Sequence, residues 1–410
     1  MRSTAVSEFY VDKNERVKKI PMIKFIRRRH AGLAIASLAL WTTLGFAQSD
    51  PASIRPLRTA PTEKFAVNAG VRDWGPATLV GQIILAGGPS GRAGLFAVDT
   101  LSGKLKWTFR PANINGSVST PPAVVGNLVI APFGSSNPGA VVAVSLASGK
   151  EVWRGPDPAV GAAVATHAGL AYIMSKDGSF SALEAATGRE VWKVAFGKRA
   201  NCVSWPIVRD GVVYVSASTG SDSYLFALDA KTGQEHWRYQ GTYRYSCLRQ
   251  PVVTGDAIYG AANHHLYAVN RASGNELWKP IEIRRQLEGK ERSVQVHALV
   301  DAGAVLIGTT SGFLIAFDKT SGAAVWEIAG KFGENSPSLA VAGNVLYFQG
   351  RLDPKADDAR GTLHALDLDT QKILWSFSRK TAEPNWSFGY VTPVDGGLWV
   401  DSYQALVKLQ

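Results

Sequence analysis

The two cysteines of this chain are the residues with the most sharply defined chemistry. Cys202 and Cys247 each lie four residues before a proline that opens an apolar run, Pro206 and Pro251. The two runs align, so the cysteines occupy equivalent positions in consecutive repeats. Such positions on adjacent inner strands are close enough for a disulfide, and a secreted chain would favour its formation. We predict a Cys202–Cys247 disulfide, with a free thiol or a redox pair as the alternatives.

Three further groups resemble reactive sites, but each lacks part of the necessary pattern. Gly87–Gly91 is glycine-rich without the Gly-Lys-Ser/Thr of a phosphate loop, which indicates a hairpin loop. His264 and His265 have no further ligands at suitable spacing for a metal. The acidic run Asp353–Asp358 lacks an EF-hand frame, and no Gly-x-Ser-x-Gly elbow opens a helix. We therefore predict no metal site and no catalytic residue.

A repeated frame built around tryptophan defines the elements that must position these groups. Seven copies place a small residue, a polar turn and a Trp at nearly fixed spacing, and in six of them Gly lies four residues before the Trp. The intervals between these tryptophans are 39 to 49 residues, a period typical of propeller blades with several short strands. We assign a structural role to all seven: Trp107, Trp153, Trp192, Trp237, Trp278, Trp326 and Trp375.

The residues around each Trp indicate a strand, a tight turn and a second strand. In the run 225–229 both sides of the first strand are apolar or small, as in a strand buried between two sheets. Asp, Asn or Ser then opens a turn that a positive-φ Gly closes. Close approach of a neighbouring blade is expected at the invariant alanine of the copies: Ala97, Ala143, Ala182, Ala227, Ala268, Ala316 and Ala365. A closed ring of blades can bury such faces, whereas one blade cannot.

The number of repeats predicts an all-β, eight-bladed propeller. Two apolar runs precede each frame, so each unit has four strands, and seven units run from about residue 75 to residue 378. The C-terminal residues 391–409 supply three strands of an eighth unit. The missing strand is predicted at Glu63–Val67, with Phe65 in place of the frame Trp. Joining the two ends in one blade closes the ring and removes exposed edges.

The frame Ala-x-Asp-x-x-Thr-Gly-x-x-x-Trp resembles the tryptophan-docking repeat of the quinoprotein-like, PQQ-type eight-bladed propellers over residues 60–410. That family contains PQQ-dependent alcohol dehydrogenases and a non-enzymatic branch of BamB-like periplasmic scaffolds. The resemblance to the enzymes implies PQQ in the central channel, stacked on a Trp, with Arg, Asn or Asp and a calcium ion around it. The enzymes also have an adjacent Cys-Cys pair and large insertions, which this sequence lacks.

Function is expected at the channel mouth and in the least repetitive loops, because loops carry binding residues on a rigid scaffold. The channel-mouth candidates are Trp205, Arg249, Gln250, Gln295, His297, Asn335 and Trp386. The loop candidates, rich in the Tyr and Arg that anchor protein interfaces, are Tyr243, Arg244, Tyr245, Arg284, Arg285 and Arg292. Trp205 and Arg249 suit PQQ, but no acidic inner-strand residue is an obvious calcium ligand.

The N-terminal residues have the pattern of a secretory signal and are not expected to form part of the propeller. Lys24 and Arg27–Arg29 precede an uncharged stretch from Ala31 to Ala47 that ends in small residues, the pattern of a signal peptide cleaved after about residue 47. Met22 is a possible true start. An uncleaved anchor is the alternative, and the absence of a cysteine near the cleavage site argues against lipidation. The domains are therefore residues 1–47 and a single propeller of residues 48–410.

The charge of the mature chain is mild. Residues 48–410 contain 35 Lys and Arg against 30 Asp and Glu, without a polybasic run, so nucleic acid is not an expected partner. We interpret the chain as a non-catalytic periplasmic scaffold that binds periplasmic or outer-membrane proteins without a cofactor, and outer-membrane protein assembly is a process that such a scaffold would serve. The alternative is an oxidoreductase that uses PQQ and calcium. The oligomeric state is not defined by the sequence.

Overall fold

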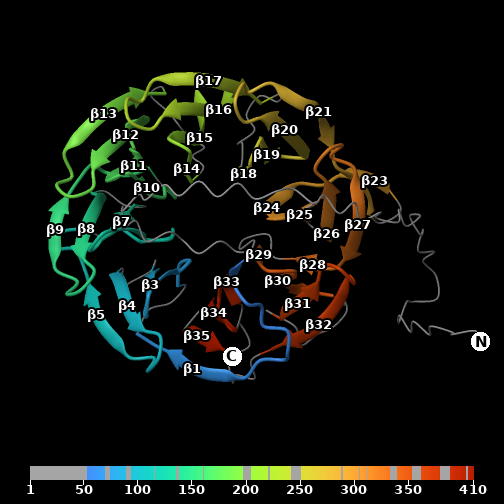
Figure 1. Cartoon of the computed structure of the whole chain (residues 1–410), viewed down its shortest axis with the longest axis horizontal. Helices are drawn as coiled ribbons and strands as arrows, with labels where there is room; N and C mark the ends of the chain where they lie inside the picture. The colour runs from blue at the N-terminus through green and yellow to red at the C-terminus, as the bar shows by residue number, and fades with distance from the viewer. Residues whose placement is uncertain are drawn as a thin grey trace, which may run out of the picture. The chain divides into compact units, whose positions relative to one another are not determined.

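The computed structural model describes residues 53–69, 74–88, 94–114, 116–134, 138–159, 161–196, 205–219, 222–241, 251–287, 290–303, 305–310, 312–332, 339–352, 362–378, 388–402 and 405–410. Eight antiparallel sheets form blades around a ring (Figure 1), which confirms the predicted eight-bladed all-β propeller. Blade 1 contains β2–β5, and blade 8 combines the C-terminal strands with β1 near the N-terminus.

Each blade has four main strands, A to D, from the channel outwards. The A strands are β2 (Thr78–Val80), β6 (Ala123–Val125), β10 (Ala165–His167), β14 (Ile207–Arg209), β18 (Val252–Val253), β24 (Val296–Ala302), β29 (Leu339–Ala342) and β33 (Phe388–Val394). The B strands are β3 (Ile83–Gly88), β7 (Leu128–Phe133), β11 (Leu170–Met174), β15 (Val212–Thr219), β19 (Ala257–Ala262), β25 (Val305–Thr310), β30 (Val345–Arg351) and β34 (Gly397–Ser402).

The outer half of each blade contains the tryptophan frame. The C strands are β4 (Gly94–Asp99), β8 (Ala140–Ser145), β12 (Ser179–Glu184), β16 (Asp222–Asp229), β20 (His265–Asn270), β26 (Phe313–Asp318), β31 (Leu363–Asp367) and β35 (Leu406–Leu409). The D strands are β5 (Leu105–Phe109), β9 (Glu151–Arg154), β13 (Glu190–Ala195), β17 (Glu235–Gln240), β21 (Glu276–Glu282), β27 (Ala324–Ala329), β32 (Lys372–Phe377) and, in blade 8, β1 (Glu63–Val67).

Three short strands extend this plan. β22 (Arg284–Leu287) and β23 (Lys290–Ser293) form a hairpin of their own between blades 5 and 6. β28 (Lys331–Phe332) pairs with the end of β30 in blade 7. The sequence predicted the hairpin region only as a loop.

The tryptophans dock each blade onto the next, as the frame predicts. In all seven frames the invariant Ala lies opposite the Trp in the C–D register, and each of these alanines is fully buried. The Trp192 indole Nε1, for example, donates a hydrogen bond of 3.0 Å to the carbonyl oxygen of Ala230 in the next blade. Five other frame tryptophans donate a corresponding bond: Trp107, Trp153, Trp237, Trp278 and Trp375.

The turn between the C and D strands explains why the frame needs a polar residue and a glycine. The Asp229 carboxylate accepts bonds from the backbone N–H groups of Lys231 and Thr232 and from the Thr232 hydroxyl. Gly233 closes the turn at a φ of 74°. A Cβ there would also lie 2.7 Å from the Trp192 ring, so glycine is required by both the backbone conformation and the docked indole.

Strand β1 and the C-terminal strands β33 to β35 meet in blade 8, as predicted. β1 pairs antiparallel with β35, with Phe65 opposite Lys408 and Val67 opposite Leu406. A Cβ on Gly103 of blade 1 would lie 2.7 Å from the Phe65 ring. Phe65 therefore occupies the place of a frame Trp, which closes the ring between blades 8 and 1.

Candidate functional site

The D-to-A and B-to-C connections share one face of the propeller, here called the top face. Five of the predicted binding residues have described side chains: Trp205, Arg284, Arg285, Arg292 and Gln295. Gln295 is partly buried. His297 is described only through its backbone in β24. The other candidates lie outside the described residues: Tyr243, Arg244, Tyr245, Arg249, Gln250, Asn335, Trp386 and the two cysteines, Cys202 and Cys247.

An aromatic pair spans the channel. Trp205 lies just before β14 of blade 4, and Tyr390 lies in β33 of blade 8. Their ring centroids are 6.4 Å apart and their planes are inclined by 38°. Because blades 4 and 8 are opposite in an eight-bladed ring, the two side chains meet across the central channel. Trp205 therefore shares its surroundings with Tyr390 of the opposite blade, and its role as a binding residue stays a prediction.

A buried carboxylate, that of Asp401, lies close to Tyr390. Asp401, in β34, is 5% exposed, and a Cβ on Gly389 would lie 2.1 Å from its Oδ2 atom. The carboxylate thus fills the space beside the backbone that precedes Tyr390. Burial raises the pKa of the Tyr390 phenol, and the negative charge of Asp401 raises it further, so the phenol is neutral at pH 7. Neither residue was predicted. Acidic groups were expected only on the inner strands, whereas Asp401 is on the B strand β34, and no repeat position marks Tyr390.

The β22–β23 hairpin is the most elaborate structure among the described top-face connections. Its base is apolar: Ile283 and Val294 are 3% and 2% exposed, and the Val294 N–H donates to the Ile283 carbonyl at 2.8 Å. The Ile283 N–H in turn donates to the carbonyl of His264, in the B–C turn of blade 5, at 2.7 Å. The hairpin is therefore fastened to the rigid blade below it.

Ion pairs position two of the predicted arginines. Arg284 donates from Nε and Nη2 to Glu282 Oε2 at 2.9 and 2.8 Å, and Arg285 Nε lies 2.6 Å from Glu327 Oε2 of blade 6. The hydroxyl of Ser293 and the Arg284 guanidinium lower the pKa of the Glu282 carboxyl. Only 17% of the Arg285 side chain is exposed. Arg284 and Arg285 thus brace the hairpin against blades 5 and 6.

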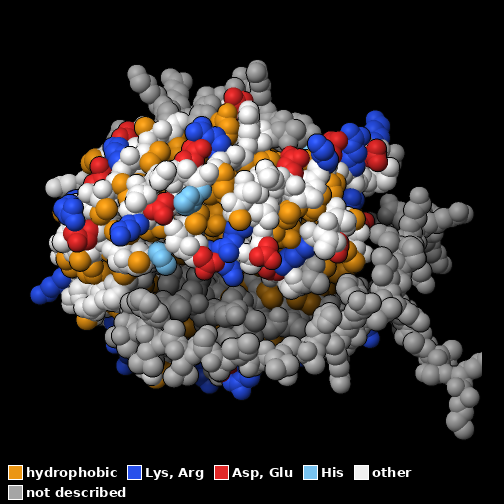
Figure 2. All heavy atoms as spheres, turned by 45° about the horizontal axis from the view of Figure 1, so that its top comes forward, with side chains coloured by type: hydrophobic (Ala, Val, Ile, Leu, Met, Phe, Trp, Pro, Cys, Tyr) orange, Lys and Arg blue, Asp and Glu red, His pale blue; other side chains and the backbone are white. Residues whose placement is uncertain are grey.

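Four other polar side chains of the hairpin's described residues face solvent. Gln286, Lys290, Glu291 and Arg292 are exposed, and Arg292 lies opposite Arg285 in the hairpin register. They form a mixed-charge platform. Figure 2 likewise shows basic, acidic and apolar side chains interspersed over the described part of one face.

The histidine pair lies under the hairpin. His265 is 9% exposed, and burial lowers its pKa, against the opposing effect of Glu282. Within the described ranges, no three His, Cys, Asp or Glu side chains gather into a possible metal site.

The repeat, the eight blades and the docked tryptophans define a propeller of the PQQ-repeat class. The family model described as "Outer membrane protein assembly factor BamB" matches residues 137–377. The chain belongs to this family of BamB-like PQQ-repeat propellers.

Solved structures share the fold at low sequence identity. BamB from Moraxella catarrhalis aligns with a TM-score of 0.63 and 16% identity over 86% of this chain and 97% of that one. The computationally designed Ika8 protein aligns at 0.63 and 15% over 85% and 98%, and a europium-containing methanol dehydrogenase at 0.60 and 14% over 83% and 84%. Among curated proteins, none matches the sequence.

In the described part of the chain, no helix is long and apolar enough to cross a membrane.

Proposed function

We propose that this chain is a non-catalytic periplasmic scaffold that docks partner proteins through its top face and channel mouth, in the assembly of outer-membrane proteins. The observation that carries the proposal is the β22–β23 hairpin. It stands on a rigid blade, and two of its arginines, Arg284 and Arg285, are already held by Glu282 and Glu327. A surface ordered before binding loses less conformational entropy on association, which suits a docking element.

The exposed part of the hairpin has the composition of a transient protein interface. Gln286, Lys290, Glu291 and Arg292 offer hydrogen-bond donors and acceptors, and their charges are of both signs, two positive and one negative. Such mixed polar surfaces give specificity and orientation rather than strong affinity. Trp205 and Tyr390 add an aromatic surface at the channel mouth, of the kind that often anchors protein interfaces.

Export is part of this proposal. Residues 1–47 would direct the chain across the inner membrane, and the oxidising periplasm would allow Cys202 and Cys247 to form a disulfide. Tyr243, Arg244 and Tyr245 would extend the docking surface from the neighbouring D–A connection.

The test is site-specific photo-crosslinking in the host bacterium. A photoreactive residue at Gln286 should yield adducts with outer-membrane assembly proteins, and the double variant Lys290→Glu/Arg292→Glu should weaken them several-fold. The matched control is the same pair of charge reversals at Lys104 and Lys106, which are exposed in and beside β5 of blade 1 and should have no effect. Adducts that are equal for both double variants would refute docking at the hairpin.

A second arm tests the enzymatic alternative. Purified protein is mixed with PQQ and calcium, and bound quinone absorbance and alcohol-dependent dye reduction are measured. Stoichiometric PQQ binding that is lost in Trp205→Ala would overturn the scaffold proposal. Trp205→Phe is the control that keeps an aromatic ring at the mouth.

A further inference from the structure

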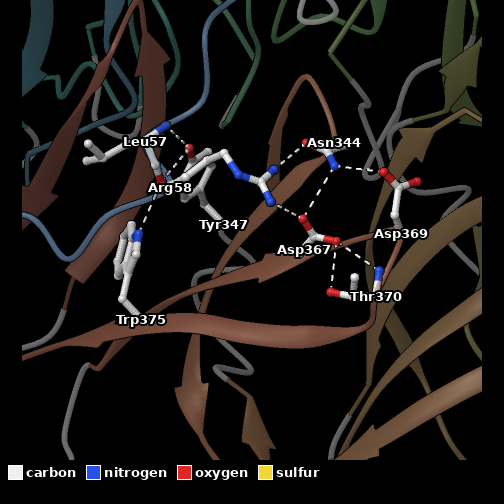
Figure 3. Close-up of polar contacts among 8 residues, drawn as sticks. All are labelled: Leu57, Arg58, Asn344, Tyr347, Asp367, Asp369, Thr370 and Trp375. Atoms are coloured by element: carbon white, nitrogen blue, oxygen red, sulfur yellow. Dashed lines mark hydrogen bonds and ion pairs between the residues drawn. The ribbon is translucent and has the colours of Figure 1, made fainter.

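The segment before β1 supplies a docking contact that the repeat itself lacks. Trp375 of blade 7 should dock on the C–D turn of blade 8, but the D strand of that blade is β1, so no C–D turn joins it to β35. The Trp375 indole instead donates a hydrogen bond of 3.0 Å to the backbone carbonyl of Leu57 (Figure 3). A segment 318 residues away in the sequence therefore takes the place of the missing turn.

Leu57 is held on both its polar and its apolar side. Its N–H donates to the Tyr347 hydroxyl of β30 at 2.7 Å, and that hydroxyl lies 3.3 Å from the Leu57 carbonyl. The Leu57 side chain is 7% exposed and belongs to the core cluster that contains Trp375, Leu398 and Leu409. The contacts reach blades 7 and 8 at once.

Arg58 adds a charged contact on blade 7 (Figure 3). Its guanidinium pairs with the carboxylate of Asp367 and donates to Asn344 Oδ1 at 2.7 Å. Asn344 Nδ2 also donates to Asp369 Oδ2 at 2.9 Å. The Asp367 side chain is 4% exposed, whereas that of Arg58 is 45% exposed. The carboxylate is thus part of the blade, and the arginine reaches it from outside.

We propose that residues 54–58 form a clasp that locks the seam between blades 7 and 8 and can be released independently of the β1–β35 pairing. In blade 4, the carbonyl that accepts the bond from Trp192 belongs to the turn between β16 and β17, so it cannot leave unless the blade unfolds. Leu57 lies outside any sheet. Its segment is held by the Tyr347, Trp375 and Arg58 contacts and, on blade 8, by the backbone N–H and carbonyl of Arg55, which bond to Asp395 and Gly396. Release of the clasp would leave both blades folded while uncovering the Trp375 indole and the Asp367 carboxylate.

The clasp lies on the face opposite the top face, because its partners are in turns of the A–B and C–D type. Asn344 follows β29, Asp367 ends β31, and Asp395 of blade 8 accepts a 3.2 Å bond from the Arg55 N–H. The state of the clasp is therefore separated from the proposed docking hairpin, and failure of one proposal leaves the other intact.

Hydrogen exchange of the full chain, followed by mass spectrometry, tests the clasp. Arg58→Ala should accelerate exchange in peptides that cover residues 53–60 at least tenfold, while peptides that cover 63–67 and 406–409 keep their protection. Asp367→Asn, which keeps the shape of the side chain, should act in the same direction. Arg55→Ala is the matched control, because the Arg55–Asp395 pair has both side chains more than 70% exposed, and it should change nothing.

Two outcomes would overturn the proposal. If β1 and β35 lose protection by the same factor as residues 53–60, the N-terminal region opens as one unit and no separate clasp exists. If neither Arg58→Ala nor Asp367→Asn accelerates exchange in residues 53–60, the polar contacts on blade 7 do not hold the segment.

Discussion

The seam between blades 3 and 4 and the seam between blades 7 and 8 make the same indole contact by different means. Trp192 donates to Ala230 and Trp375 donates to Leu57, each at 3.0 Å. Ala230 belongs to a turn inside a sheet, whereas Leu57 belongs to a segment that reaches its blade from the opposite end of the chain. The same indole-to-carbonyl hydrogen bond can therefore differ in stability from one seam to another, because its stability depends on the structure that holds the accepting carbonyl in place. The first seam should be as stable as its blade, and the second only as stable as the clasp and β1.

The largest effect is expected from removing residues 53–67, which deletes the clasp and β1 together. The deletion exposes the edge of β35, the Trp375 indole and the core around Leu398, so we expect loss of cooperative folding of the whole ring. Thermal unfolding followed by circular dichroism measures this. A variant whose melting temperature equals that of the intact chain would refute closure by the N-terminal segment.

The next largest effect is expected from Trp192→Ala and Trp375→Ala. Truncation of a buried indole costs about 3–5 kcal/mol. Trp375 is 5% exposed, so its loss should lower the free energy of unfolding in urea by an amount of that order, and loss of the partly buried Trp192 should lower it by less. The two should differ in their local consequences. Trp375→Ala should also loosen residues 53–60 in hydrogen exchange, whereas Trp192→Ala should leave that segment protected. If residues 53–60 exchange equally fast in both variants, the two seams are not held in different ways.

Acid should weaken the clasped seam through Asp367. Hydrogen bonds from Thr370 and the Arg58 guanidinium lower the pKa of this carboxyl to about 2, so its stabilising contribution is fully present above about pH 4 and is lost as the pH falls through 2. Water around the exposed half of Arg58 screens the pair, which limits the contribution to about 1–2 kcal/mol.

Asp367→Asn should remove this part of the acid dependence, and comparison of urea unfolding at pH 6 and pH 2.5 measures it. Ser145 occupies the corresponding turn position in blade 2, so that turn has no carboxylate to protonate. A steeper acid loss in Asp367→Asn than in the unaltered chain would contradict the assignment.

The smallest effect is expected from Arg55→Ala. The Arg55–Asp395 pair has an Nη2 to Oδ2 distance of 3.4 Å and two exposed side chains, and exposed pairs contribute roughly 0–1 kcal/mol. Unfolding in urea should change by less than about 0.5 kcal/mol. A loss as large as that of Arg58→Ala would show that the clasp extends to blade 8 through its surface charges.

The blades could be predicted from the sequence because each is a local unit. The spacing of Ala227, Asp229, Gly233 and Trp237 alone specifies a buried strand, a turn and a docked indole. The same alignment placed β1 at Glu63–Val67 and identified Phe65 as the substitute for a frame Trp. The Cys202–Cys247 disulfide stays a prediction, since both residues lie outside the described ranges.

The candidate sites were less predictable. Trp205 was placed at the channel mouth, but its partner Tyr390 comes from a blade 185 residues later, and no repeat position links the two. Arg285 was assigned to a binding loop on composition, and the structure shows it paired with Glu327 of the next blade. Composition identifies which side chains suit an interface but not which of them the fold already uses.

The sequence by itself determined the architecture: eight blades, the position of the docked tryptophans and the strand that completes the ring. Only the tertiary structure decided how the last seam is fastened. The acceptor for Trp375 is a backbone carbonyl. Every residue has such a group, so no sequence motif can identify the one that accepts this bond. Its position follows from where ring closure brings residues 53–67 against blades 7 and 8, and that geometry exists only once all eight blades have formed.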